Sequence, residues 1–210
     1  MSIRREKPGM SNHQEHTFVF EPTMTTTTIA LLPAILNRRS HRSFEKKAIS
    51  QEHINLLFEA ARWAPSAMNA QPWEYLYATP ENADSFNRMV EGLNPPNQIW
   101  AKNAGLLMIC TVAKTYENGN PYRHNLHDAG LANAQLLIQA SALGLSGHIM
   151  GGINAEQLAE SFSISPNHEI VCCIAVGYPG DGSDLENDQL RQRENAPRLR
   201  KDTENVARKA

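Results

Sequence analysis

The chain has 210 residues, with 22 acidic and 20 basic side chains and a formal net charge of −2 at pH 7. This length suits one domain with an extension, because globular domains commonly contain about 100 to 200 residues. A nearly balanced charge lacks the basic field with which nucleic-acid-binding proteins displace counterions from phosphates. We therefore expect a protein that buries a substantial core and does not bind nucleic acid.

Apolar segments and cysteines indicate where the protein resides. No apolar stretch reaches the roughly 20 residues that span a bilayer, and the longest candidate, Leu131 to Leu145, is interrupted by polar side chains. Cys110, Cys172 and Cys173 lie inside apolar runs and show neither metal-site spacing nor a disulfide framework. We expect a soluble cytoplasmic protein that does not associate with membranes.

The N-terminal segment, residues 1–28, is polar and rich in threonine. It lacks the cationic region, apolar run and small-residue cleavage site of a signal peptide. We interpret it as a flexible extension, and the alternative is that Phe18-Val19-Phe20 forms an arm that packs on a partner subunit. The main domain is expected to occupy residues 29–210.

Two helices and a strand are predicted in the first part of this domain. Apolar residues at helical spacing begin at Ile29 and run into the basic segment, Arg38-Arg39-Ser40-His41-Arg42. A second helix begins after Ser50, whose hydroxyl can cap it, and stops near Pro65. Trp73 to Thr79 mixes aromatic and aliphatic residues as a strand does.

The remainder of the domain is predicted to alternate between buried strands and helices. Leu106 to Ala113 is a continuous apolar run, typical of a strand buried on both faces at the centre of a sheet. His124 to Leu143 predicts a long central helix, Ala155 to Phe162 a short one, and Glu169 to Gly177 a third strand. This mixture, without strict strand-helix-strand alternation, predicts a single α+β domain.

The C-terminal tail, from Asp181 to Ala210, is charged and poor in large apolar residues. Such a composition cannot bury enough apolar surface to offset the entropy of ordering the chain. Taken alone, it predicts a solvated or disordered end.

The basic segment offers guanidinium groups and a hydroxyl within five positions, which suits a phosphate or a polarised carbonyl. The alternative, more common for a short basic run, is a solvated helix end whose charge complements the helix dipole. The sequence of this segment alone leaves both interpretations open.

The connecting loop, Ala64 to Trp73, places small, polar and turn-forming residues between a helix and a strand. Asn69 and Gln71 supply paired donors and acceptors that suit the edge of a planar heterocycle. An ordinary polar turn, in which these amides bond their own backbone, is the alternative.

The glycine segment, Ser146 to Gly152, supplies residues that let a backbone amide approach a ligand closely, or alternatively a plain helix C-cap. His124 and His127 have no third ligand in view, so no metal site is expected. The sequence also contains no nucleophile elbow and no glycine-rich nucleotide loop. These absences leave hydrolase and kinase functions without support.

Taken in order, these segments resemble the nitroreductase family of FMN-dependent NAD(P)H oxidoreductases. The resemblance extends from about Leu31 to Lys201 and includes the basic segment, the connecting loop and the glycine segment. It also includes Asp128-Ala129-Gly130 in the long helix and Val176-Gly177-Tyr178-Pro179. The family implies a mostly antiparallel sheet surrounded by helices, in an intertwined homodimer that holds FMN between its subunits.

The resemblance assigns cofactor-binding roles to residues in both halves of the chain. Arg38, Ser40 and Arg42 match the residues that hold the FMN phosphate and ribityl chain, with Arg42 nearest the pyrimidine edge and Arg39 as a helper. In the loop that the other subunit lays against the ring, the matching residues are Pro65, Ser66, Ala67, Asn69 and Gln71. Residues whose backbone amides approach the ring near N5 and O4 are Met150, Gly151 and Gly152, and the C-terminal pair that clamps the phosphate is Arg198 and Arg200.

The resemblance also implies a reaction. Hydride from NADPH or NADH would pass through the flavin to a small-molecule acceptor, such as a nitroaromatic or quinone, in ping-pong order, with no obligatory catalytic side chain. Other outcomes within this fold are flavin destruction, dehalogenation and dehydrogenation. A flavin-storage protein without turnover and an interaction domain without a cofactor are the non-enzymatic alternatives.

Overall fold

The structure is a computed structural model that describes residues 31–210. The predicted extension, residues 1–28, therefore lies outside the described residues, as do the first two residues of the predicted first helix. The described part of that helix is α1 (Pro33–Asn37), which begins with a proline. Proline has no backbone N–H, and in the first turn this costs no hydrogen bond, because N–H groups there have no partner within the helix.

A four-stranded sheet forms the middle of the molecule, with strand order β1-β2-β4-β3. Its strands are β1 (Trp73–Ala78), β2 (Leu106–Ala113), β3 (Ser146–Met150) and β4 (His168–Gly177). Every ladder between these strands is antiparallel. This arrangement confirms the predicted α+β class and the mostly antiparallel sheet.

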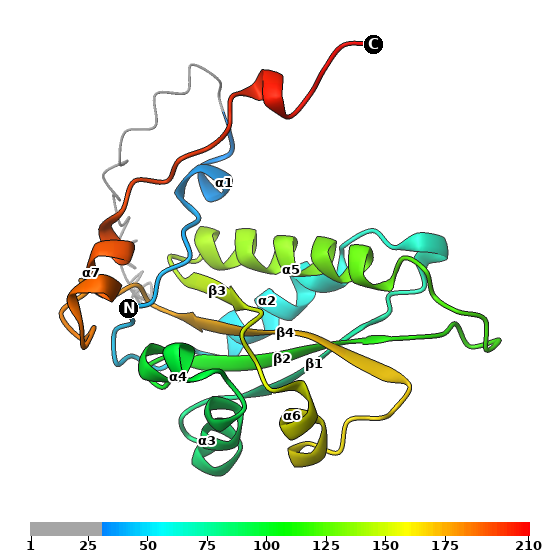
Figure 1. Ribbon diagram of the computed structural model, residues 1–210, viewed down its shortest axis with the longest axis horizontal. Coiled ribbons are helices and arrows are strands. Elements are labelled where there is room, and N and C mark those ends of the chain that lie inside the picture. The colour runs from blue at the N-terminus through cyan, green and yellow to red at the C-terminus, as the bar shows by residue number, and fades with distance from the viewer. Residues whose placement is uncertain (1–30) are drawn as a thin grey trace, which may run out of the picture.

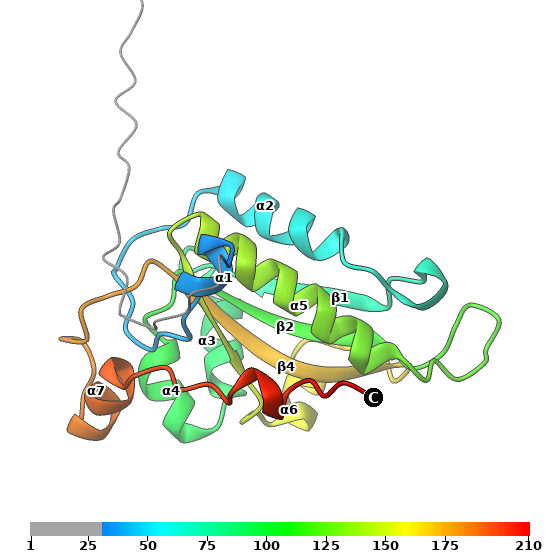
Figure 2. The ribbon, with the colours of Figure 1, turned by 90° about the horizontal axis from the view of Figure 1, so that it is seen from above.

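Helices cover both faces of the sheet. Figures 1 and 2 show α2 (Gln51–Arg62) and α5 (Asn125–Ala142) running side by side over one face. On the opposite face lie α3 (Ala83–Glu91), α4 (Pro95–Ala101) and α6 (Ala155–Ser161) (Figure 1). The sheet therefore separates two hydrophobic cores, each closed by its own layer of helices.

β2 shows why both faces must be covered. Successive side chains of a strand point to opposite faces, so a continuous apolar run needs a core on each side. Leu106, Met108 and Cys110 pack toward α2 and α5, while Leu107 and Ile109 pack in the other core. The prediction of a strand buried on both faces is confirmed, and β2 shares the interior of the sheet with β4.

The predicted helix boundaries of α2 and α5 are also confirmed. The Ser50 hydroxyl accepts a hydrogen bond from the His53 N–H at 3.2 Å, which caps the start of α2. After α5, Gly144 adopts a φ of +70°, a conformation that favours glycine, and the Leu145 N–H donates to the Ala140 carbonyl at 2.8 Å.

Several elements were not predicted. Residues 80–105 received no assignment, yet they form α3 and α4, where Phe86, Met89 and Trp100 enter the second core. The glycine segment, for which the sequence predicts ligand-binding backbone or a plain helix C-cap, contains the edge strand β3. Serine, glycine and histidine give this strand none of the apolar alternation that indicates a strand.

The expectation of a solvated or disordered tail is wrong for part of it. Residues Asp188–Asn195 form α7, capped by the Asn187 side chain, which accepts from the Leu190 N–H at 2.9 Å. Leu190 and Glu194 are buried, because the tail folds back on the start of the domain. A single-turn helix, η2 (Thr203–Asn205), follows in the exposed end.

No helix in residues 31–210 is long and apolar enough to span a membrane. The three cysteines are free and buried. Within the same residues, no group of three or more His, Cys, Asp or Glu side chains could hold a metal ion.

The start of α5 fixes the connecting loop. The Asp128 carboxylate, 2% exposed, accepts hydrogen bonds from the Ala67 N–H at 2.8 Å and the Tyr122 hydroxyl at 2.8 Å. Its other oxygen lies 2.9 Å from His127 Nδ1. Burial alone would raise the pKa of Asp128, but these hydrogen bonds together hold that pKa below its ordinary value.

The replacement Asp128→Asn tests this anchor. A carboxyl whose folded-state pKa is lowered stabilises the protein above its unfolded-state pKa of about 3.9, and this contribution is lost as the pH falls through the folded-state value. We expect the variant to lose about 2 kcal/mol of unfolding free energy at neutral pH, with a deficit that shrinks toward pH 3. Urea unfolding at fixed protein concentration measures this difference.

The matched control is Asp84→Asn, which removes a carboxylate from the first turn of α3 where the side chain is 82% exposed. We expect this control to change the unfolding free energy little at any pH. If Asp128→Asn lowered the unfolding free energy by the same amount at neutral pH and near pH 3, this result would contradict the proposed role of the Asp128 carboxylate.

Candidate functional site

The basic segment lies against the C-terminal tail (Figure 1). Arg198 donates hydrogen bonds to the carbonyls of Arg38 and Leu36 at 2.6 and 2.5 Å. In the reverse direction, Arg39 donates to the carbonyls of Glu194 and Ala196, both at 2.5 Å. The predicted basic residues from the two ends of the domain therefore meet, and the Arg39 guanidinium is engaged in fastening the tail.

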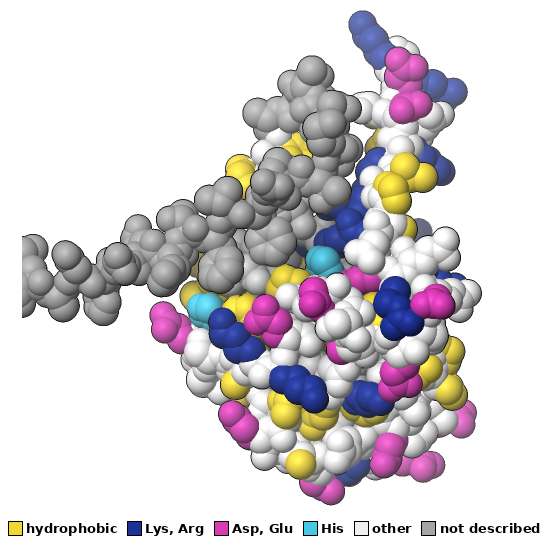
Figure 3. Space-filling view, turned by 90° about the vertical axis from the view of Figure 1, so that its left-hand side faces the viewer, with side chains coloured by type: hydrophobic (Ala, Val, Ile, Leu, Met, Phe, Trp, Pro, Cys, Tyr) yellow, Lys and Arg dark blue, Asp and Glu magenta, His cyan; other side chains and the backbone are white. Residues whose placement is uncertain are grey.

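Three arginines form a cationic cluster at this junction. Burial and the charge of Arg200 lower the pKa of Arg38, and burial with Arg200, Arg39 and Arg38 lowers the pKa of Arg198. Within residues 31–210, no carboxylate forms an ion pair with Arg38, Arg198 or Arg200. Figure 3 shows Lys and Arg side chains along the tail above the body.

A cluster of this kind is suited to an anion. The mutual repulsion of the guanidinium groups would be relieved by a doubly charged phosphate, which guanidinium forks bind through paired hydrogen bonds. Ser40 adds a hydroxyl, which accepts a hydrogen bond from Arg38 at 3.3 Å. The predicted phosphate-holding residues Arg38, Ser40, Arg198 and Arg200 thus come together at one place.

The connecting loop has a strained backbone. It contains η1 (Ala67–Asn69), and Met68, Asn69 and Gln71 have φ values of 56°, 55° and 47°, in the left-handed region that disfavours side chains. Such strain persists where neighbouring groups fix it, and it is common at ligand sites.

Hydrogen bonds hold the loop in this shape. The Gln71 N–H donates to the Ser66 hydroxyl at 3.0 Å, and the Gln71 side-chain amide donates to the Asn69 carbonyl at 3.2 Å. Pro65 precedes these residues, and Asp128 holds the Ala67 N–H. The loop therefore presents Asn69 and Gln71 in a preformed arrangement, although the Gln71 amide also bonds its own loop, as the polar-turn alternative expected.

The three residues at the end of β3 have different surroundings. Met150 is buried and pairs with Cys173 of β4. The Gly152 carbonyl accepts hydrogen bonds from the Asn94 N–H at 2.9 Å and the Asn97 side-chain amide at 3.1 Å. By contrast, a Cβ at Gly151 would have no atom within 4 Å from residues 31–210 other than its neighbours in the chain, so this position leaves space for a ligand.

The basic segment and the connecting loop lie at opposite ends of the sheet (Figure 1). The loop leads into Trp73, which pairs with Val112 at one end, whereas the Ser146 side chain contacts the basic segment from the other end, where Ser146 pairs with Gly177. The 10 residues of β4 run between these ends, which corresponds to about 30 Å. Within one chain, Arg42 and Asn69 therefore cannot contact the same heterocycle.

A groove beside the connecting loop is also separate from the basic segment. It has a volume of about 760 Å³ and is lined by Asn69, Gln71, Tyr116 and His168, among others, but by no residue of the basic segment. Within one chain, the basic segment therefore lies at one end of the sheet, and the connecting loop with its groove lies at the other.

Sequence reasoning missed three residues that hold the connecting loop or the basic segment in place, which are Asp128, Tyr122 and Glu194. A signal was available for Asp128, since an acid among the small apolar residues of a central helix is expensive to bury without partners. The sequence gives a weaker indication that Glu194 is buried. This residue lies among arginines in a tail whose composition predicts a solvated segment.

The chain is similar to known proteins in both sequence and fold. Residues 35–178 match the model of the nitroreductase family. A crystal structure described as an oxidoreductase containing FMN is 34% identical, with a TM-score of 0.80, over 86% of this chain and 92% of its own. A nitroreductase family protein from Clostridium difficile, 19% identical, shares the fold with a TM-score of 0.65 over 87% of this chain and 99% of its own.

Sequence relatives carry related names. A protein from Archaeoglobus fulgidus with the provisional name NADH dehydrogenase/NAD(P)H nitroreductase is 28% identical over 158 residues, 73% of this chain and 88% of the relative. The oxygen-insensitive NADPH nitroreductase of Helicobacter acinonychis is 25% identical over 68% of this chain and 85% of its own length. With the family model matching more than half of its residues, the chain belongs to the nitroreductase family.

Proposed function

We propose that the protein is an FMN-dependent oxidoreductase that takes hydride from NADPH or NADH and delivers it to small acceptors such as nitroaromatics or quinones. The observation that carries this proposal is the cluster of Arg38, Arg198 and Arg200 at one end of the sheet, together with the strained loop of Asn69 and Gln71 at the other. The names of the FMN-containing structure and of the NADPH nitroreductase support the same cofactor and donor.

The described residues fit FMN. Arg38, Arg198 and Arg200 supply positive charge for a phosphate monoester, and Ser40 supplies a hydroxyl beside it. A planar heterocycle needs donors and acceptors at its edge and unobstructed backbone against its face, which the connecting loop and Gly151 provide.

We propose that two subunits complete each site. The basic segment, the arginines of the tail and Met150 to Gly152 of one chain would meet Pro65, Ser66, Ala67, Asn69 and Gln71 of the partner subunit. On α5, Leu126, Gly130 and Ala134 follow one another at four-residue intervals and are exposed. The small residues Gly130 and Ala134 would let a second helix approach closely, and the exposed Leu126 offers an apolar contact, which supports association through this face.

The protein's part in the reaction is positional and electrostatic. Bound FMN would supply the redox chemistry, accepting hydride at N5. Arg42, at the pyrimidine edge, would stabilise the negative charge that develops there, and a backbone amide near Gly151 would orient the ring. No side chain has to act as a general acid or base, because the flavin would carry the redox chemistry.

The first test is anaerobic reduction of the purified protein saturated with FMN. We expect NADPH or NADH to bleach the flavin absorption near ~450 nm, because the cofactor carries the redox chemistry, and a quinone or nitroaromatic to restore it. A protein that binds FMN but does not bleach would be a storage protein or an enzyme of another reaction. A protein that does not bind added FMN would refute the proposal.

Steady-state kinetics test the order of the two half-reactions. We expect donor and acceptor to occupy the same open face in turn, so initial rates with NADPH varied at several quinone concentrations should give parallel double-reciprocal lines. Intersecting lines would show that both molecules bind together and would contradict the ping-pong mechanism.

A further inference from the structure

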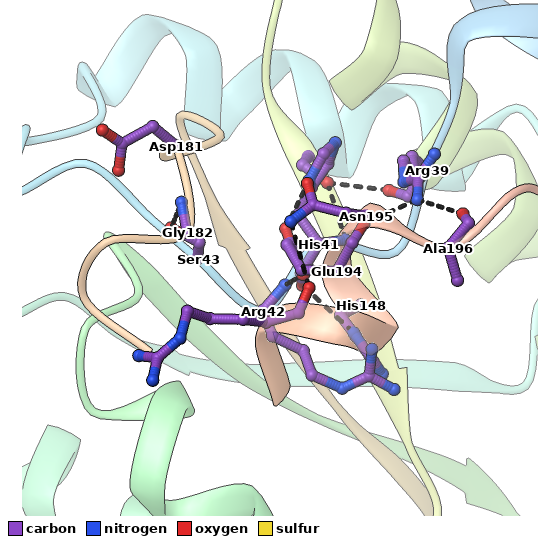
Figure 4. A network of polar contacts seen from close by, with 12 residues as sticks. Arg39, His41, Arg42, Ser43, His148, Asp181, Gly182, Glu194, Asn195 and Ala196 are labelled. Carbon is purple, nitrogen blue, oxygen red and sulfur yellow. Dashed lines mark hydrogen bonds and ion pairs between the residues drawn. The ribbon is translucent and has the colours of Figure 1, made fainter. Parts of the chain in front are cut away.

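Glu194, in the last turn of α7, is a buried acid that faces the basic segment. Its carboxylate is only 5% exposed, and Oε1 lies 2.6 Å from Nδ1 of His41. Its other oxygen, Oε2, accepts a hydrogen bond from the backbone N–H of Arg42 at 2.8 Å. Figure 4 shows Glu194 turned toward His41 and Arg42, so an acid from the tail is bonded to the residue assigned to the flavin ring.

These hydrogen bonds keep the carboxylate ionised. Burial raises the pKa of Glu194, but the hydrogen bonds from His41 and from the backbone N–H groups of Arg42 and Ser43 outweigh burial and lower it. Both carboxylate oxygens are engaged in this way. Within residues 31–210, the Arg42 guanidinium forms no ion pair with Glu194 or any other acid.

Fold stability alone does not account for a buried carboxylate at this place. Removing a charge from water is costly, and a well-packed apolar side chain often stabilises a fold as much or more. An apolar side chain could not accept the Arg42 N–H, however. What the carboxylate supplies is a fixed backbone at Arg42, and hence a fixed starting point for its side chain.

We propose that Glu194 is a positioning residue of the flavin site. It orients the backbone at Arg42 and leaves the Arg42 guanidinium free for the pyrimidine edge of the ring. Because Glu194 belongs to the tail, which Arg39 and Arg198 also fasten to the basic segment, cofactor affinity depends on α7 being docked. This role rests on the proposed function.

The test compares three variants of the full chain by their affinity for FMN, measured by quenching of flavin fluorescence. Glu194→Ala should bind FMN about tenfold to a hundredfold more weakly, the effect of losing charge-assisted hydrogen bonds. Glu194→Gln should be intermediate, since its amide oxygen can still accept the Arg42 N–H. The control Asp188→Asn, on the same helix with a side chain 99% exposed, should bind FMN like the wild type.

Two further readouts separate positioning from stability. The melting temperature of each FMN-free variant reports its stability, and the visible spectrum at saturating FMN reports the surroundings of the ring. We expect the spectrum of bound flavin to shift in Glu194→Ala, because Arg42 is displaced from the ring edge.

Wild-type FMN affinity and spectrum in Glu194→Ala, with only a lower melting temperature, would overturn the positioning role. If Glu194→Ala does not fold, the test relies on Glu194→Gln. Unchanged FMN affinity in Glu194→Gln would overturn the positioning role, and weaker FMN affinity would support it. Failure of the wild-type protein to bind FMN would instead refute the proposed function, and this role with it.

Discussion

The length of the antiparallel sheet is the constraint on which the arrangement of the site depends. β4 spans 10 residues, or about 30 Å, and the two groups of ligand-binding candidates lie beyond its two ends. Arg38, Arg198 and Arg200, which form no ion pair with an acid of residues 31–210, gather at one end. A strained loop that contains Asn69 and Gln71 stands at the other. Because the two groups lie about 30 Å apart within one chain, the proposed site draws one group from each of two chains.

Helix α5 and the strand that follows it, β3, hold the connecting loop and the basic segment in place. At the start of α5, Asp128 holds the connecting loop through the Ala67 N–H. Just beyond its end, the Ser146 hydroxyl donates to the Arg39 carbonyl at 2.7 Å and accepts from the His41 N–H at 3.3 Å. Because the buried face of α5 packs against the sheet that contains β3, the loop and the basic segment are attached to the same packed core. Preorganised groups of this kind lose little entropy when a ligand binds.

The sequence predicted those parts of this arrangement whose signals are local. β2 is a continuous apolar run, and α2 and α5 carry their own caps, so their positions could be inferred from neighbouring residues. β3 has no apolar alternation, and α7 is polar, with Leu190 and Glu194 buried by residues far away in the chain. The Glu194 carboxylate bonds the Arg42 N–H across 152 positions, a contact that no local pattern contains. The candidate site residues were predicted from the order of the motifs along the chain. The structure adds the hydrogen bonds that hold these residues in place.

Complementation between two inactive variants tests most directly whether each site is built from two chains. Arg42→Ala impairs the basic segment and Asn69→Ala impairs the connecting loop, so each homodimer would carry two damaged sites. In a purified heterodimer of the two variants, the account predicts one site with both defects and one intact site, hence about half of the wild-type FMN binding and reductase activity. If each site were instead formed within a single chain, both sites of the heterodimer would remain damaged, and the absence of any recovery would contradict the account.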